Sequence, residues 1–75
     1  MERYENIDGD SGVAGYESGA DYIRVQFSDG SVYLYTYTSA GSLAIERMKA
    51  LAAAGRGLNA FINTNAKKSY ARKER

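Results

Sequence analysis

Hydrophobic and polar residues alternate with a period of two in the first half of the chain, which is typical of half-buried strands. Residues 22–27 show this alternation clearly, and residues 31–37 are dense in β-branched and aromatic side chains. Asp29-Gly30, which lies between these stretches, is a strong hairpin signal. A shorter apolar stretch over 13–16 comes before them. The pattern predicts three antiparallel strands in a meander.

After residue 41 the hydrophobic spacing changes to that of a helix. Ser42 is a suitable N-cap for a helix over 43–54, and Gly55 is suited to end it in the left-handed conformation. A second helix is predicted from Leu58 to about Tyr70. The expected buried positions of the two helices are Ile45, Met48, Leu51, Ala52, Leu58, Phe61, Ile62 and Ala66. We therefore expect an α+β fold, in which a three-stranded antiparallel meander is followed by two α-helices packed on one face.

Tyr33, Tyr35 and Tyr37 occupy alternate positions, which predicts that they share one face of the sheet. A two-residue loop at the hairpin would pair Val25 with Leu34 and leave the tyrosines as an exposed stacking platform. A three-residue loop with a glycine bulge would pair Val25 with Tyr33 and turn the tyrosines toward the helices. Both registers stay open, and the buried arrangement is favoured because tyrosines in strands are usually half-buried.

The length and composition indicate one ordinary globular domain over residues 1–75, in which about 1–10 and 72–75 are expected to be flexible. The chain has 75 residues, of which 44% are hydrophobic and 25% charged. A domain this short has a stability of only a few kcal/mol. No stretch approaches the roughly 20 apolar residues that a membrane span needs, so we expect no membrane partner and a cytoplasmic location.

The chain contains no histidine and no cysteine. These residues supply the commonest general base, the thiolate nucleophile and the usual zinc ligands. We therefore expect no enzyme, no metal site and no cofactor. Asp8-Gly9-Asp10 begins like a calcium loop, but Val13 stands where an EF-hand requires glycine.

Positive charge is concentrated toward the C-terminal end. Residues 1–54 carry four basic and eight acidic groups, whereas residues 55–75 carry six basic groups and one acidic group. This asymmetry predicts an anionic partner, although a solvated helix end rich in lysine would have the same composition. The paired glycines of Gly55-Arg56-Gly57 come before a predicted helix, and Arg56 beside them is a further candidate phosphate ligand.

Four segments match a known pattern in order and spacing: Ser11-x-Val13-x-Gly15-Tyr16, Ile23-x-Val25-x-Phe27-x-x-Gly30-x-x-Tyr33-x-Tyr35, Ala54-Gly55-x-Gly57-Leu58-Asn59-x-Phe61-Ile62, and Tyr70. Together they resemble the KTSC domain, which is found at the C-terminus of some lysyl-tRNA synthetases and as small stand-alone bacterial proteins. The family has no established activity, and the resemblance implies RNA binding by analogy with the synthetase context. The chain departs from the family at Asn63, where an arginine is usual, so the basic charge shifts to Lys67 and Lys68.

The leading hypothesis is a small non-catalytic module that binds RNA or another nucleic acid. Stacking on tyrosines and phosphate contacts from basic side chains would supply the affinity. The candidate binding residues are Arg24, Tyr33, Tyr35, Arg56, Lys67, Lys68, Arg72 and Lys73. The alternative is a module for protein interaction or self-association, which would use an edge strand over 33–37.

Overall fold

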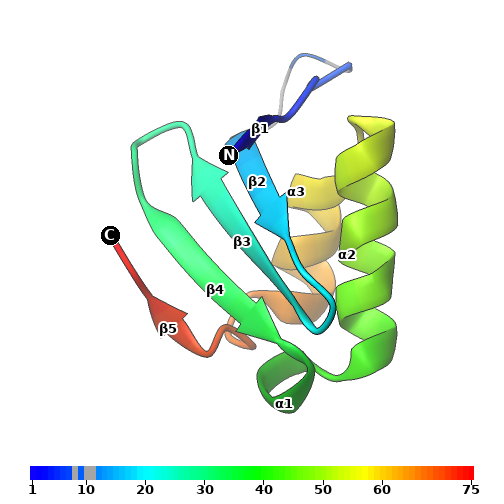
Figure 1. Cartoon of the computed structure of the whole chain (residues 1–75). Helices are drawn as coiled ribbons and strands as arrows, with labels where there is room; N and C mark the ends of the chain where they lie inside the picture. Colours follow the sequence, from blue (N-terminus) through cyan, green and yellow to red (C-terminus); the bar gives the residue numbers. More distant parts are fainter. Residues whose placement is uncertain (8, 10–11) are drawn as a thin grey trace.

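Over residues 1–7, 9 and 12–75, which the computed structural model describes, five antiparallel strands form one sheet in sequence order (Figure 1). The strands are β1 (Glu2–Arg3), β2 (Val13–Ser18), β3 (Tyr22–Phe27), β4 (Val32–Thr36) and β5 (Arg72–Lys73). The predicted meander corresponds to the three longer strands, and a two-residue strand is added at each edge. Three residues named above lie outside the described residues: Asp8 and Asp10 of the segment that begins like a calcium loop, and Ser11, at which the KTSC resemblance begins.

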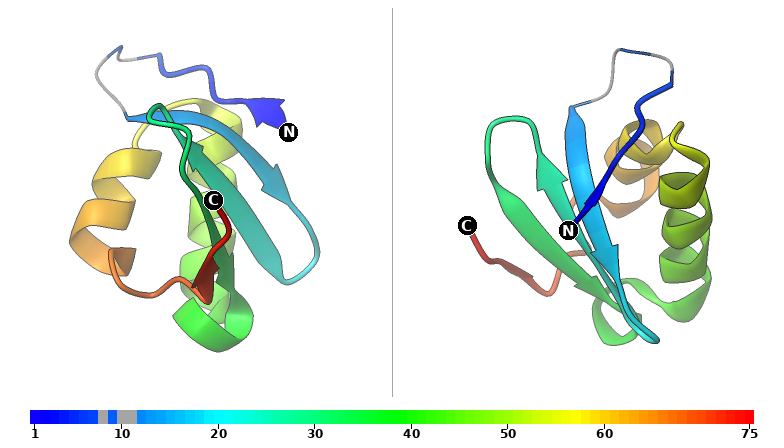
Figure 2. Two further views of the ribbon diagram at one scale, coloured as in Figure 1. Left: turned by 90° about the vertical axis from the view of Figure 1, so that its left-hand side faces the viewer. Right: turned by 45° about the horizontal axis from the view of Figure 1, so that its top comes forward.

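Helices pack against one face of this sheet (Figure 2). They are the short α1 (Tyr37–Ala40), the long α2 (Ser42–Ala54), the one-turn α3 (Leu58–Phe61) and the π-helix η1 (Ile62–Ala66). The α+β class with helices against an antiparallel sheet is thus confirmed. Gly55 ends α2 in the left-handed conformation with φ 77°, as predicted, whereas Gly41 and not Ser42 is the N-cap residue.

The prediction of a strand through Tyr37 was wrong, because a capping box ends β4 at Thr36. The Thr36 hydroxyl oxygen accepts a hydrogen bond from the Ser39 amide at 3.1 Å, and the Ser39 hydroxyl oxygen accepts one from the Thr36 amide at 3.0 Å. This reciprocal pairing begins a helix. Tyr37 therefore leaves the face that it was expected to share with Tyr33 and Tyr35, and its hydroxyl donates to Glu46 instead.

The second helix is also shorter than predicted, since it changes to π geometry at Ile62 and ends at Ala66 instead of near Tyr70. The Thr64 hydroxyl donates to the Ala60 carbonyl at 2.9 Å. Side chains of this kind compete with the backbone for helical hydrogen bonds. The chain then turns back toward the sheet, which carries Tyr70 against the rings of β4.

The hairpin between β3 and β4 has the three-residue loop. The Phe27 amide donates to the Ser31 carbonyl at 2.8 Å, and Gly30 takes the positive φ of 92° that the bulge requires. Val25 consequently pairs with Tyr33, and Ile23 pairs with Tyr35. The favoured interpretation is confirmed for Tyr35, which faces the helices and is only 1% exposed.

The N-terminal segment, which was expected to be flexible, contributes to the core. Tyr4 is 3% exposed, and its hydroxyl oxygen accepts a hydrogen bond from the Leu58 amide at 3.2 Å. The Ile7 amide donates to the Gly55 carbonyl at 2.8 Å. The segment therefore runs from the edge of the sheet to the corner between α2 and α3. The core consists of Tyr4, Val13, Ile23, Val25, Tyr35, Ile45, Met48, Ala52, Leu58, Ile62 and Ala66.

The C-terminal segment, also expected to be flexible, lies along the edge of β4. Backbone hydrogen bonds join Ala71 and Glu74 to the carbonyls of Leu34 and Val32, at 2.6 Å and 2.7 Å. Tyr33 and Leu34 of the edge strand that the self-association hypothesis used are therefore already paired with β5.

Candidate nucleic-acid interface

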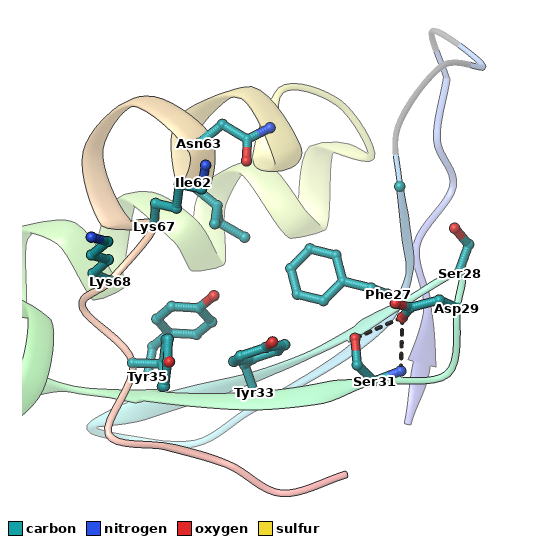
Figure 3. Close-up of a pocket in the computed structure, with 12 residues that line it drawn as sticks. Phe27, Ser28, Asp29, Ser31, Tyr33, Tyr35, Ile62, Asn63, Lys67 and Lys68 are labelled. Atoms are coloured by element: carbon teal, nitrogen blue, oxygen red, sulfur yellow. Dashed lines mark hydrogen bonds between the residues drawn. The ribbon is translucent and has the colours of Figure 1, made fainter.

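A pocket of about 510 Å³ opens between the β3–β4 hairpin and η1 (Figure 3). It exists because the helices do not cover the whole inner face of the sheet at the end where the hairpin loop lies. The three-residue loop turns Phe27 and Tyr33 inward toward this uncovered region. The pocket therefore depends on the hairpin register as much as on the helices.

Aromatic rings line the middle of the pocket. The centroids of Tyr33 and Tyr70 lie 4.8 Å apart, and those of Phe27 and Tyr33 lie 5.6 Å apart, both in edge-to-face geometry. This geometry is favourable for aromatic pairs and holds the rings in place. Tyr35 also lines the pocket, but it is almost fully buried, whereas Tyr33 is half-buried and Tyr70 is 39% exposed. Tyr33 and Tyr70 therefore offer the accessible ring surface.

The two ends of the pocket differ in charge. Lys67 and Lys68, both exposed, follow η1 at one end, and Asp29 and Ser31 from the hairpin lie at the other, with the rings between them (Figure 3). Hydrogen bonds from the hydroxyl and the amide of Ser31, at 2.7 Å and 3.0 Å, lower the pKa of the Asp29 carboxyl below its ordinary value. The pocket thus has a cationic end and an anionic end.

Lys73 adds a third cation beside the rings. Its ammonium nitrogen lies 5.8 Å from the centroid of Tyr33, which is within the range of a cation–π contact. Because β5 pairs Lys73 directly with Tyr33, the position of this lysine is set by the sheet. The predicted residues Tyr33, Lys67 and Lys68 therefore line one pocket, and Lys73 lies beside it against Tyr33.

Arg24 and Arg72 lie elsewhere, on the face of the sheet opposite the tyrosines. Arg24 Nε is 2.7 Å from Glu74 Oε1, and Arg24 Nη1 is 2.9 Å from Glu17 Oε2. Arg72 Nη2 is 3.0 Å from Glu74 Oε2. Hydrogen bonds from Arg24, followed by those from Arg72, lower the pKa of Glu74. This chain of four charged residues joins β5 to β2 and β3, so both arginines have carboxylate partners within the domain.

Glu74→Gln is expected to loosen β5 without unfolding the domain. The Glu74 amide donates to the Val32 carbonyl, and the Val32 amide donates to the Arg75 carbonyl, next to β5. Hydrogen exchange of both amides should become faster by at most about fivefold, because ion pairs this exposed are weak. Lowering the pH through the depressed pKa of Glu74 should have the same effect, since this carboxylate stabilises the strand only while it is ionised. The matched control is Glu17→Gln, which removes the other partner of Arg24 and should leave β5 unchanged.

Arg56 lies at the corner between α2 and α3, outside the pocket lining. The amides of Gly55 and Arg56 both donate to the Leu51 carbonyl, at 3.0 Å and 3.4 Å. These N–H groups therefore terminate α2. They do not point at an anion, although the two glycines had suggested a phosphate site here. At the pocket itself, the anionic-partner hypothesis therefore depends on Lys67 and Lys68, with Lys73 beside them.

Phe27 and Asp29 were not among the predicted binding residues, because the sequence marked them only as part of a strand and of the hairpin turn. The three-residue loop places both at the pocket, so a firm choice of register would have indicated them.

Within the described residues, histidine, cysteine and carboxylate side chains form no group suited to a metal ion, and none of the helices has the length and apolar character of a membrane span. The chain matches no family model, no curated protein and no solved structure.

Proposed function

We propose that this chain is a non-catalytic module that binds single-stranded RNA in the aromatic pocket. The observation that carries the proposal is the grouping of three lysines, Lys67, Lys68 and Lys73, around rings with accessible surface. Unpaired bases stack on aromatic side chains, and lysines contact the phosphates that connect those bases. The proposal agrees with the resemblance to the KTSC domain and with a cytoplasmic location, both of which remain predictions.

Fewer basic residues are expected to contact phosphates than the sequence suggested. Arg24 and Arg72 are paired with carboxylates on the opposite face, so the three lysines remain as the expected phosphate ligands near the pocket. Three contacts to single-stranded RNA correspond to a slope of roughly −2 in a plot of log affinity against log salt. The affinity should therefore fall by roughly 20-fold between about 50 mM and 200 mM salt.

The double substitution Lys67→Ala/Lys68→Ala is expected to weaken RNA binding and to flatten its salt dependence. Loss of two of the three contacts should bring the slope to roughly −0.7. The measurement is fluorescence anisotropy of a labelled single-stranded RNA at several salt concentrations. Arg3→Ala/Arg47→Ala is a matched control, because it removes the same formal charge from two exposed residues that do not line the pocket.

Two results would contradict the proposal. One is that the unmodified chain does not bind RNA at low salt, and the other is that the double lysine variant and its control lose affinity equally. The second result would mean that overall charge, and not the pocket, determines binding. All four substituted residues are exposed, so the fold should be retained in both variants, and a circular dichroism spectrum of each checks this.

A further inference from the structure

We infer that the pocket selects guanine among the four RNA bases, with Asp29 accepting hydrogen bonds from the edge of the base. The inference rests on the RNA-binding function proposed above and names the base that the pocket would hold. Its starting point is the polarity of the pocket, which has the Asp29 carboxylate at one end and Lys67 and Lys68 at the other (Figure 3).

The Asp29 carboxylate is held in a defined position. Its Oδ1 accepts hydrogen bonds from the amide and the hydroxyl of Ser31, at 3.0 Å and 2.7 Å. These bonds lower the pKa of the group, so it is ionised at neutral pH. An ionised carboxylate only accepts hydrogen bonds and has about four lone-pair sites, of which the bonds from Ser31 use two. Asp29 therefore keeps the capacity to accept hydrogen bonds from a ligand in the pocket.

Guanine is the RNA base whose Watson–Crick edge presents two adjacent donors, the N1–H and the exocyclic amino group. Adenine and cytosine each place a ring-nitrogen acceptor beside their amino group, and uracil places its single N–H between two carbonyl oxygens. Because both bonds from Ser31 go to Oδ1, the Oδ2 atom of Asp29 keeps two acceptor sites, which can receive the two adjacent donors of guanine, whereas every other base places at least one acceptor beside its donor. The Asp29 carboxylate, which only accepts hydrogen bonds, therefore complements guanine best.

The remaining parts of the pocket suit a nucleotide in this orientation. Tyr33 lies between the charged ends, and Tyr70, which packs against Tyr33, also lines the pocket. Both offer ring surface for the base. Lys67 and Lys68 line the pocket at the end away from the hairpin, so a phosphate at that end would meet two cations. The volume of about 510 Å³ is within the range of roughly 300–1,000 Å³ that is typical of small-molecule pockets.

The test uses short labelled RNAs that are identical except for one central base in a uridine tract: guanosine, inosine, adenosine or uridine. Guanosine should bind about tenfold more tightly than adenosine or uridine, because only guanine offers two donors to Asp29. Inosine lacks the exocyclic amino group and should bind more weakly than guanosine. Asp29→Asn should remove the preference for guanosine while retaining salt-dependent binding of the uridine RNA.

The asparagine variant is chosen because its side-chain oxygen can still accept from Ser31, so the hairpin is retained. Asp21→Asn is the matched control, because Asp21 is an exposed acid that does not line the pocket, and this variant should keep the preference. Equal binding of the four RNAs, or a preference for guanosine that persists in Asp29→Asn, overturns the inference and leaves the RNA-binding function intact. If none of the RNAs binds at low salt, the RNA-binding function itself is wrong.

Discussion

Replacing Tyr4 with alanine is expected to leave most molecules unfolded at 25 °C. Tyr4 is 3% exposed within the core, and truncation of a buried aromatic side chain costs about 3–5 kcal/mol. A domain of this size has a free energy of unfolding of only a few kcal/mol, so the loss is comparable to the whole stability. The measurement is urea denaturation followed by circular dichroism.

Tyr4→Phe divides this effect into its two components, because it keeps the ring and removes the hydroxyl. The Leu58 amide at the start of α3 would then lose its acceptor, which should lower the free energy of unfolding by about 1–3 kcal/mol. Leu43→Ala is the control, since Leu43 is 88% exposed and its loss should change stability by less than about 0.5 kcal/mol. If Tyr4→Ala is as stable as this control, Tyr4 does not pack in the core.

The second large effect is a loss of stability at alkaline pH that depends on Tyr35. Burial, and then the neighbouring Tyr33 and Tyr70, raise the pKa of Tyr35 to about 12. In the unfolded chain the same hydroxyl has an ordinary pKa of about 10. Between these values the unfolded state releases the proton while the folded state retains it, so the stability falls as pH rises. Two pKa units correspond to about 2–3 kcal/mol, which is fully lost above about pH 12.

Tyr35→Phe isolates this contribution, because it retains the buried ring and has no hydroxyl to ionise. Urea denaturation at a series of pH values should show the unmodified chain losing about 2–3 kcal/mol more than the variant between pH 9 and pH 12. All other tyrosines and lysines are common to both proteins, so their titration cancels in the comparison. Parallel curves for the two proteins would show that Tyr35 does not ionise with a raised pKa.

The regular parts of the fold could be predicted because their signals are local and repeated. The alternation over 22–27 gave β3, and the stripe of apolar residues at helical spacing gave α2, which ends at Gly55 as expected. The register of the hairpin was harder, because Asp29-Gly30 fits a loop of two residues or of three. The hydrogen bonds of Ser31 with Phe27 and Asp29 fix the longer loop, and they depend on residues on both sides of the turn.

The short edge strands could not be predicted, since strands of two residues are too short to show a period. Nothing in the polar sequence around Tyr4 indicates that its hydroxyl reaches Leu58, which lies 54 positions further along the chain. The candidate site could be predicted only in part, because it also depends on contacts between residues far apart in the sequence. The tyrosines and lysines stood out by type, whereas the ion pairs that occupy Arg24 and Arg72 depend on how the C-terminal segment folds back.

The position of β5 has a consequence for synthesis on the ribosome. It emerges after the other four described strands, supplies pairing for the edge of β4, and places Lys73 beside Tyr33. Until that segment has left the exit tunnel, the backbone groups at the edge of β4 are open to other nascent chains. Docking of β5 covers part of this edge and places Lys73 against Tyr33, so the exposure of the β4 edge ends as this wall of the pocket forms.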